Sequence, residues 1–245
     1  MSQAQVELSV IIPAYNEAVR LPRTLRRLHE YLSVRPFTYE IIVVLDGSTD
    51  NTRNVVQELN LAKVKIINRS VNRGKGYTVK EGMLNASGVI RLFSDADNST
   101  DIAHFEAMKS FFDNGYDLVI ASRHSNDVAA AVQAVPQACY KQLLGRAGNA
   151  IVQCLAVPGI WDTQCGFKAF RGEVAERIFS RTTVDGWGFD IEVLALARAL
   201  NYRVGIIPAY WINDVSSHFG GLDYWRVLRE IFRIRHNLKT CKYDL

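Results

Sequence analysis

Two aspartates separated by a single residue, Asp95 and Asp97, are the sharpest chemical feature of the sequence. In an extended segment, residues i and i+2 project to the same side, so both carboxylates can face one ligand. Carboxylates held this close repel each other unless a cation lies beside them. A hard divalent ion, Mg²⁺ or Mn²⁺, bound by these carboxylates and by phosphate oxygens of a substrate satisfies that arrangement. Taken alone, the pair is equally well explained as solvated loop acids or as a cap for a helix that begins near Asp101.

Short apolar segments rich in Val and Ile alternate with amphipathic stretches in the first half of the chain. Such segments are typical of strands that are buried on both faces of a parallel sheet. The alternation predicts a single α/β domain, a Rossmann-like, mostly parallel sheet flanked by helices. The expected strands are Leu8–Ile12, Glu40–Val44, Val64–Ile67, Val89–Phe93, Leu118–Ala121 and Arg203–Ile207, and the expected helices are Arg20–Tyr31, Asp50–Asn60, Lys141–Leu155, Phe189–Leu200 and Asp223–Lys239.

Polar residues gather directly after these expected strands. Pro13–Glu17 follows the first strand, Asp46–Ser48 the second, Asp95–Asp97 the fourth and Ser122-Arg123 the fifth. In such sheets ligands bind beyond the carboxyl ends of the strands, so these residues are expected to meet at one ligand-binding edge. The turn Asn72–Gly76 is basic, contains glycine and precedes a helical stretch, which makes it a candidate anion site. It lacks the Ser or Thr of a P-loop, and the sequence contains no G-x-G-x-x-G.

In this order, the strand-end motifs VIIPAYNE, VVLDGSTD, NRGKG, SDADNST and IASR resemble the inverting family-2 glycosyltransferases of the GT-A fold. Two later segments, DTQCGFKAF (Asp162–Phe170) and GWGFDIEVL (Gly186–Leu194), are similar to the branch that transfers a sugar to dolichyl or polyprenyl phosphate. Within that branch they look more like the glucosyl than the mannosyl enzymes. The resemblance therefore implies a metal-dependent hexosyltransferase whose favoured donor is UDP-glucose, with GDP-mannose or a soluble acceptor as alternatives.

The resemblance also implies roles for individual residues. It places Asp95 and Asp97 as ligands of Mg²⁺ or Mn²⁺. Asp190 and Glu192 would orient the acceptor, and the alternative is that they are acids that stabilise a helix N-terminus. Relatives usually have two aspartates before Gly47, and Leu45 replaces the first of them, which affects either base selectivity or the backing of the site. The implied residues are Pro13, Tyr15, Glu17, Asp46, Lys75, Asp95 and Arg123 for the donor, Lys141, Gln164 and Lys168 for the acceptor phosphate, and Asp97, Arg123, Asp190 and Glu192 for catalysis.

The implied reaction is an in-line displacement at the anomeric carbon, with the nucleoside diphosphate leaving from the opposite face. A phosphate monoester acceptor has a second pKa of about 6 and is largely dianionic at neutral pH, so it needs little help from a base. It needs positive charge near an anionic donor, and the candidates are Arg123, Lys141 and Lys168. A hydroxyl acceptor would instead require a carboxylate as general base.

The composition is ordinary for a soluble globular protein. The 245 residues are 48% hydrophobic and 22% charged, and the formal net charge of +4 does not call for nucleic acid as a partner. With no apolar run of about 18 residues and no signal peptide pattern, a cytoplasmic protein is expected. Cys139, Cys154, Cys165 and Cys241 form no C-x-x-C pair, which favours buried, reduced thiols.

The end of the chain is a basic amphipathic segment with aromatic residues. We expect one transferase domain over residues 1–222, followed by a helix and tail over 223–245. Such a helix either lies in a membrane interface or packs on the domain with its arginines in solvent, and the two readings are evenly matched.

Two further function classes stay open at this point. The segment Asp95–Ser99 partly matches the D-x-D-x-[T/V] nucleophile motif of haloacid-dehalogenase-type phosphatases, but that motif normally follows the first strand, whereas three expected strands precede it here. A catalytically silent nucleotide-sugar binder is the other class. Retention of Asp95, Asp97 and Arg123 argues against it, while Leu45 argues for it.

Overall fold

A computed structural model describes residues 5–129, 132–133, 148–211 and 221–245 of the chain. Seven strands form one sheet in the order β3-β2-β1-β4-β7-β5-β8, and β6 and β9 form a separate parallel pair. The single α/β domain and its mostly parallel sheet are thereby confirmed. The strands are β1 (Leu8–Ala14), β2 (Tyr39–Asp46), β3 (Val64–Arg69), β4 (Ile90–Ser94), β5 (Leu118–Ser122), β6 (Val132–Gln133), β7 (Phe167–Arg171), β8 (Val204–Pro208) and β9 (Tyr210–Trp211).

Strand β7 is the one strand of the large sheet that runs against its neighbours. It lies between β4 and β5 and is antiparallel to both, whereas the other neighbouring pairs are parallel. The six strands expected from the sequence are all present, with ends that differ by a few residues at most. The strand β7 was not expected, because its residues Phe167–Arg171 carry no long apolar run of their own.

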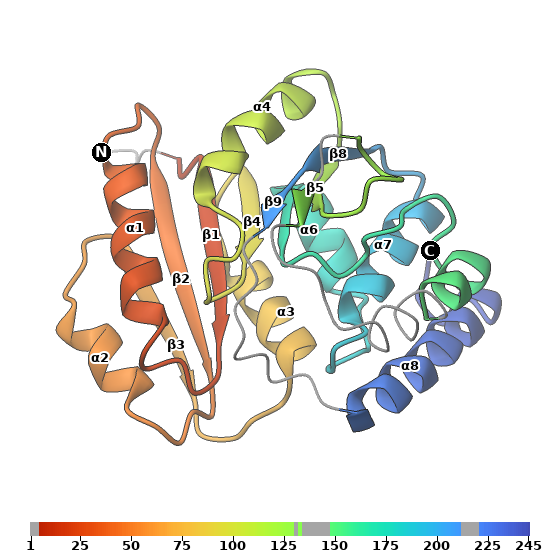
Figure 1. Ribbon diagram of the computed structural model, residues 1–245, viewed down its shortest axis with the longest axis horizontal. Helices are drawn as coiled ribbons and strands as arrows, with labels where there is room; N and C mark the ends of the chain where they lie inside the picture. Colours follow the sequence, from red (N-terminus) through yellow and green to blue (C-terminus); the bar gives the residue numbers. More distant parts are fainter. Residues whose placement is uncertain (1–4, 130–131, 134–147, 212–220) are drawn as a thin grey trace.

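Helices cover both faces of the sheet (Figure 1). One core packs α1, α2 and α4 against the sheet, and the other packs α3, α6, α7 and α8 against its opposite face. Helices α4 and α6 were not among the expected helices, and the helix expected at 141–155 is described over residues 148–155. The helices are α1 (Leu21–Ser33), α2 (Thr52–Glu58), α3 (Lys75–Asn85), α4 (Phe105–Asp113), α6 (Gly172–Phe179), α7 (Phe189–Ala199) and α8 (Gly221–Lys239), with a short 3-10 turn at Ile102–His104.

Helix α8 is packed on the domain by its inner face. Its residues Ile231 and Ile234 are buried in the core that also contains α7, and Tyr243 beyond the helix is buried there too. None of the helices described here is both long enough and apolar enough to cross a membrane.

The cysteines differ from the expectation of uniformly buried thiols. Cys165 is buried, whereas Cys154 and Cys241 are exposed, and all three are free. Cys139 lies outside the described residues. Burial raises the pKa of the Cys165 thiol to about 11, so that thiol is neutral at physiological pH.

A buried carboxylate, Glu40, ties β2 to its neighbours at the end of the sheet opposite the strand-end motifs. Its Oε1 accepts hydrogen bonds from Ser9 Oγ at 2.6 Å and from the backbone N and Oγ of Ser87 at 2.8 Å each. Its Oε2 accepts from Lys65 Nζ at 2.6 Å. Burial raises the pKa of Glu40, but these hydrogen bonds outweigh it and lower the pKa from 4.5 to about 2.

The depressed pKa of Glu40 makes folding stability depend on pH. The shift corresponds to about 3 kcal/mol, present above the unfolded pKa near 4.5 and lost as pH falls towards 2. We expect Glu40→Gln to lower the free energy of unfolding by about 2–3 kcal/mol at pH 7 and by progressively less below pH 4.5. Urea denaturation at pH 7 and at pH 3 measures the loss of stability, with Glu58→Gln, a substitution at an exposed glutamate, as a control. A deficit of the same size at pH 7 and pH 3 would contradict the linkage.

Candidate active site

The carboxyl ends of β1, β2, β4 and β5 lie at one edge of the sheet because these strands run in the same direction. Strand β7 runs the other way, so its beginning lies at this edge, where Phe167 pairs with Ser94 at the end of β4. The antiparallel insertion therefore brings the Cys165-Gly166 segment beside Asp95. The Asp95 backbone N donates to Gly166 O at 3.1 Å.

Asp95, Asp97 and Lys75 form the centre of this edge. Lys75 Nζ lies 2.7 Å from Asp95 Oδ1. Asp97 Oδ1 accepts a hydrogen bond from Ser99 N at 2.9 Å, which holds the turn after β4 in shape. Burial lowers the pKa of Lys75, but Asp95, Asp190 and Asp97 together raise it above its ordinary value. Lys75 is thus a fully charged ammonium surrounded by carboxylates.

A second cation, Lys168, reaches the same cluster from inside the sheet. Its side chain is 1% exposed, and its Nζ donates to Asp190 Oδ1 at 2.5 Å and to Cys165 O at 2.6 Å. Asp190 lies in the first turn of α7. Burial raises the pKa of Asp190 above its ordinary value, more than the neighbouring Lys168 and Lys75 lower it. The structure brings Asp190, Lys168 and Lys75 together with Asp95.

Arg123, directly after β5, forms an ion pair with Asp162, which was not among the site residues expected from the sequence. Its Nε and Nη2 donate to the two oxygens of Asp162 at 2.7 Å each, and its backbone N donates to Asp162 Oδ2 at 2.8 Å. Burial lowers the pKa of Arg123, but Asp162 outweighs it, so the pKa is raised. Burial likewise raises the pKa of Asp162, and Arg123 outweighs it and lowers that pKa. This bidentate pair fixes the direction of the guanidinium.

Asp46 organises the basic turn before α3. Its Oδ1 accepts from Arg73 N at 2.8 Å and from Arg69 Nη2 at 2.7 Å, and its Oδ2 accepts from Gly74 N at 2.9 Å. A carboxylate has about four acceptor positions, so three bonds leave capacity for one more donor, such as a base N–H. The neighbouring Leu45 is 0% exposed and packs in the core with α1 and α2. Its position favours a packing role over base contact.

The loop after β1 is docked on the loop after β2. Asn16 Oδ1 accepts from Thr49 N at 2.8 Å, and Asn16 itself has a positive φ of 55°. Pro13 is buried in β1, and Tyr15 is 39% exposed at the rim of the edge. Both oxygens of Glu17 accept from Arg20, at 2.7 and 2.5 Å. Glu17 therefore stabilises the start of α1, directly after the loop that follows β1, and its expected contact with the donor stays a prediction.

Glu192 lies on the other side of α7 from Asp190, since two residues along a helix correspond to a rotation of about 200°. Its carboxylate accepts from the backbone N of Thr183 at 3.0 and 2.9 Å and of Val184 at 2.9 Å, and from Tyr243 Oη at 2.7 Å. It is 0% exposed. These contacts favour a structural role for Glu192, and its expected part in catalysis stays a prediction.

The remaining expected residues lie in different places. Gln164 Nε2 is 3.5 Å from Trp187 O, so it joins the segment before β7 to the segment before α7. Lys141 lies outside the described residues. Sequence reasoning did not single out Asp162, Gly166 or Trp187 individually, although all three belong to the two later motifs. A Cβ on Gly166 would lie 1.9 Å from Asp95 Oδ2, so a side chain there and the present Asp95 position exclude each other.

The donor atoms of this edge fit a hard divalent cation that also binds substrate oxygens. Within the described ranges, no three His, Cys, Asp or Glu side chains come together as a metal site. Asp95 and Asp97, after β4, are the two carboxylates that would hold the ion, and Ser99 Oγ is buried without a hydrogen-bond partner among the described residues. Carboxylates outnumber cations in the cluster, which consists of Asp95, Asp97, Asp162 and Asp190 with Lys75, Arg123 and Lys168. A cation held jointly with a diphosphate suits this balance.

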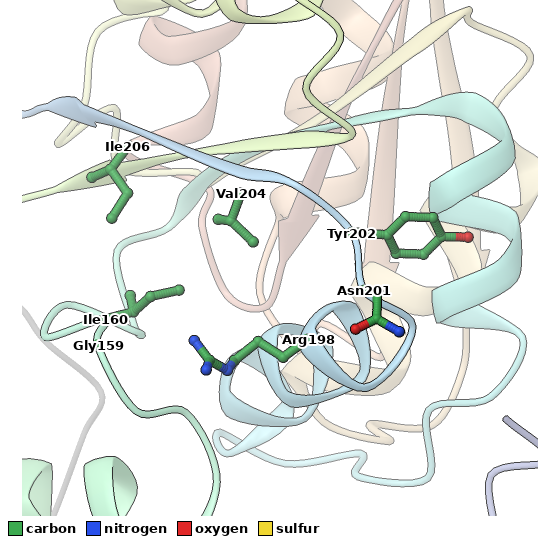
Figure 2. Close-up of a pocket in the computed structure, with 7 residues that line it drawn as sticks. All are labelled: Gly159, Ile160, Arg198, Asn201, Tyr202, Val204 and Ile206. Carbon is green, nitrogen blue, oxygen red and sulfur yellow. The ribbon is translucent and has the colours of Figure 1, made fainter.

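A separate hollow of about 470 Å³ lies at the outer edge of the sheet, away from this cluster (Figure 2). It is lined by the apolar side chains of Ile160, Val204 and Ile206 and by polar groups of Arg198 and Asn201. None of the described residues that line it has a carboxylate, and none of them was expected from the sequence to take part in the chemistry.

A comparison with known protein families assigns the chain to a family. Residues 9–179 match the model of glycosyl transferase family 2, which is more than half of the chain. The chain belongs to glycosyl transferase family 2. This match confirms the family expected from the strand-end motifs, and the phosphatase alternative is excluded.

The relatives of this family-2 transferase include dolichyl-phosphate beta-glucosyltransferases. ALG5D of Trichomonas vaginalis is 36% identical, over 86% of this chain and 67% of the relative. The enzyme of Dictyostelium discoideum is 35% identical, over 94% of this chain and 74% of the relative. The enzyme of Homo sapiens is 34% identical, over 91% and 72%. The similarity extends well beyond the strand-end motifs.

Solved structures show the same fold at lower identity. Mannosyltransferase PcManGT from Pyrobaculum calidifontis, in complex with GDP-Man and Mn²⁺, has a TM-score of 0.61 at 21% identity, over 98% of this chain and 65% of that chain. Glucosyl-3-phosphoglycerate synthase from Mycobacterium tuberculosis, in complex with Mn²⁺ and UDP-Glc, has a TM-score of 0.66 at 19% identity, over 95% and 79%. The GT-A fold of the transferase is therefore confirmed.

Proposed function

We propose that this transferase moves glucose from UDP-glucose onto a polyprenyl phosphate of the dolichyl type, with inversion at the anomeric carbon. The observation that carries the proposal is the cluster at the sheet edge. There, two carboxylates at the end of β4 stand beside Lys75, Lys168 and the Arg123–Asp162 pair. The choice of glucose and of a dolichyl phosphate rests on the dolichyl-phosphate beta-glucosyltransferases among its relatives.

The donor is expected to lie along the edge from β2 to β4. Pro13, Tyr15 and Asp46 line the base and ribose, and Asp46 keeps one acceptor position for a base N–H. Lys75 at the start of α3 faces the diphosphate, where both its charge and the helix N-terminus favour an anion. Asp95 and Asp97 would hold Mg²⁺ or Mn²⁺, which supplies positive charge to the leaving diphosphate when bound.

The acceptor is expected on the side of β5 and β7. A phosphate acceptor is already a strong nucleophile at neutral pH, and what it needs is positive charge beside an anionic donor. Arg123 and Lys168 supply that charge, and Asp162 and Asp190 hold these two side chains in place. Gln164 lies between Asp162 and Lys168 in the sequence, and its side chain contacts the Trp187 backbone. Lys141 is proposed as a further phosphate contact on sequence grounds alone.

Helix α8 is the proposed contact with the membrane that contains the lipid acceptor. Trp225 and Phe232 are 73% and 55% exposed, and Arg229 between them is exposed as well. These residues stand at i, i+4 and i+7 and share the outer face of the helix, opposite the buried Ile231 and Ile234. Exposed aromatic side chains can insert at the level of the lipid headgroups, and an arginine beside them attracts anionic lipids. We place the reaction at the cytoplasmic face of such a membrane.

Donor screening with a lipid acceptor tests the proposed function. The protein is incubated with radiolabelled UDP-glucose or GDP-mannose and with dolichyl phosphate in anionic vesicles, with and without Mn²⁺, and sugar in the lipid phase is counted. We expect glucose transfer that needs the metal and stops in excess chelator.

Three results would contradict parts of this proposal. Preferential use of GDP-mannose would overturn the sugar, and equal transfer in excess chelator would overturn the metal. If the protein does not sediment with the vesicles at low ionic strength, the membrane contact is overturned, because attraction between opposite charges is strongest at low ionic strength.

A further inference from the structure

Lys75 pairs directly with a carboxylate that is expected to hold the metal. Its Nζ lies 2.7 Å from Asp95 Oδ1. The same ammonium lies 5.1 Å from the centre of the Trp187 ring and 5.6 Å from that of Phe93. A divalent cation at this oxygen must displace the ammonium or tolerate its repulsion at close range.

The chain holds Lys75 at this place through its backbone. Lys75 is the first residue of α3, and Gly74 before it donates its N–H to the Asp46 carboxylate at 2.9 Å. Gly76 after it donates to Asp185 O at 2.8 Å and has no room for a Cβ, which would lie 2.4 Å from a backbone oxygen. The start of α3 is thus clamped on both sides, and Lys75 is a preset part of the site.

Asp95 is equally restricted. Its backbone N donates to Gly166 O at 3.1 Å, and its carboxylate fills the space that a Cβ of Gly166 would need. Its side chain is 31% exposed and that of Lys75 is 19% exposed, so water weakens their attraction less than at an open surface. Both partners of the ion pair are therefore held facing each other before any ligand binds.

We propose that Lys75 is the resident counter-ion of the Asp95 carboxylate and makes metal binding depend on the donor diphosphate. The inference rests on the proposed function, because it takes the diphosphate as the ligand that joins metal and protein. Without donor, the ammonium and the divalent cation compete for Asp95. With donor, the diphosphate oxygens accept from the Lys75 ammonium and complete the metal's shell of oxygen ligands. Metal and donor then bind with positive coupling, which is reciprocal.

Direct metal binding tests this coupling without any turnover. Mn²⁺ is titrated with wild-type protein and with Lys75→Met, with and without UDP, and free Mn²⁺ is measured by electron paramagnetic resonance. For wild-type protein, we expect UDP to raise Mn²⁺ affinity at least about tenfold. For Lys75→Met, we expect Mn²⁺ alone to bind on the order of tenfold more tightly than to wild-type protein, with a correspondingly smaller effect of UDP.

Two control variants separate the proposed role from general charge effects. Lys75→Arg keeps the charge and should keep the weak binding of Mn²⁺ alone, while Lys109→Met removes a half-exposed lysine from α4 and should change nothing. Near-ultraviolet circular dichroism shows that the variants are folded. Equal affinity of wild-type protein and Lys75→Met for Mn²⁺ alone, with Lys75→Met folded, overturns the inference. Wild-type protein that binds no UDP even with Mn²⁺ contradicts instead the proposed function.

Discussion

Asp97→Asn is expected to lower the rate of sugar transfer by at least about a hundredfold, the usual effect of removing one group that stabilises charge in a transition state. Asn has the same shape as Asp, and its Oδ1 can keep the 2.9 Å hydrogen bond from Ser99 N. The turn after β4 is therefore preserved, and the variant loses only one negative charge beside the expected metal. Steady-state kinetics with UDP-glucose, at a series of Mn²⁺ concentrations, measures the loss and the accompanying demand for more metal.

The matched control for this charge is Asp113→Asn, an exposed aspartate at the end of α4. It changes the net charge of the protein by the same amount but lies away from the strand-end motifs, so its rate should equal that of wild-type protein. A wild-type rate for Asp97→Asn would refute the assignment of Asp97 as a ligand of the catalytic metal.

Gly166→Ala is expected to reduce transfer by about a hundredfold while leaving the protein folded. The new Cβ would lie 1.9 Å from Oδ2 and 2.3 Å from Cγ of Asp95, so the Asp95 carboxylate must rotate away. A displacement of about 1 Å among reacting groups lowers the rate by about a hundredfold. The clashing atoms are the end of a side chain, so the free energy of unfolding should fall by only about 1 kcal/mol. Kinetics and urea denaturation of the same preparation measure both quantities.

A double-mutant cycle shows whether this effect passes through Asp95. In an Asp95→Ala background the added methyl group has no carboxylate to displace, so Gly166→Ala should cost little further activity there. Gly148→Ala is the control for a glycine substitution in general, since a Cβ at Gly148 meets no atom of the described residues within 4 Å. Additive losses in the double variant would show that Gly166 acts independently of Asp95.

The ligand-binding edge could be predicted from the sequence because its determinants are local. Each expected strand is marked by its own run of β-branched residues, and the polar residue that follows is read from the same stretch. Parallel strands then place Asp46, Asp95 and Arg123 at one edge without further information. The structure has all three at that edge, although their roles in the reaction stay a prediction.

The partners of these residues could not be predicted, because they come from distant parts of the chain. Asp162 holds Arg123 although 39 residues separate them. Gly166 matters because a Cβ at this position would clash with Asp95. The clash arises only because the antiparallel β7 brings Gly166 against Asp95. Likewise Asp190 and Glu192 look equivalent in sequence, and the packing of α7 decides that Asp190 meets Lys168 while Glu192 meets Tyr243.

The fold class, the family and the two carboxylates at the end of β4 could be predicted from the sequence alone, since the periodicity and motifs that carry them span a few residues each. The pairing of Lys75 with Asp95 and the burial of Lys168 follow from the three-dimensional packing and not from any local pattern. The physical reason is that an ion pair depends on distance in space, and no local pattern encodes which opposite charge the fold brings within 3 Å.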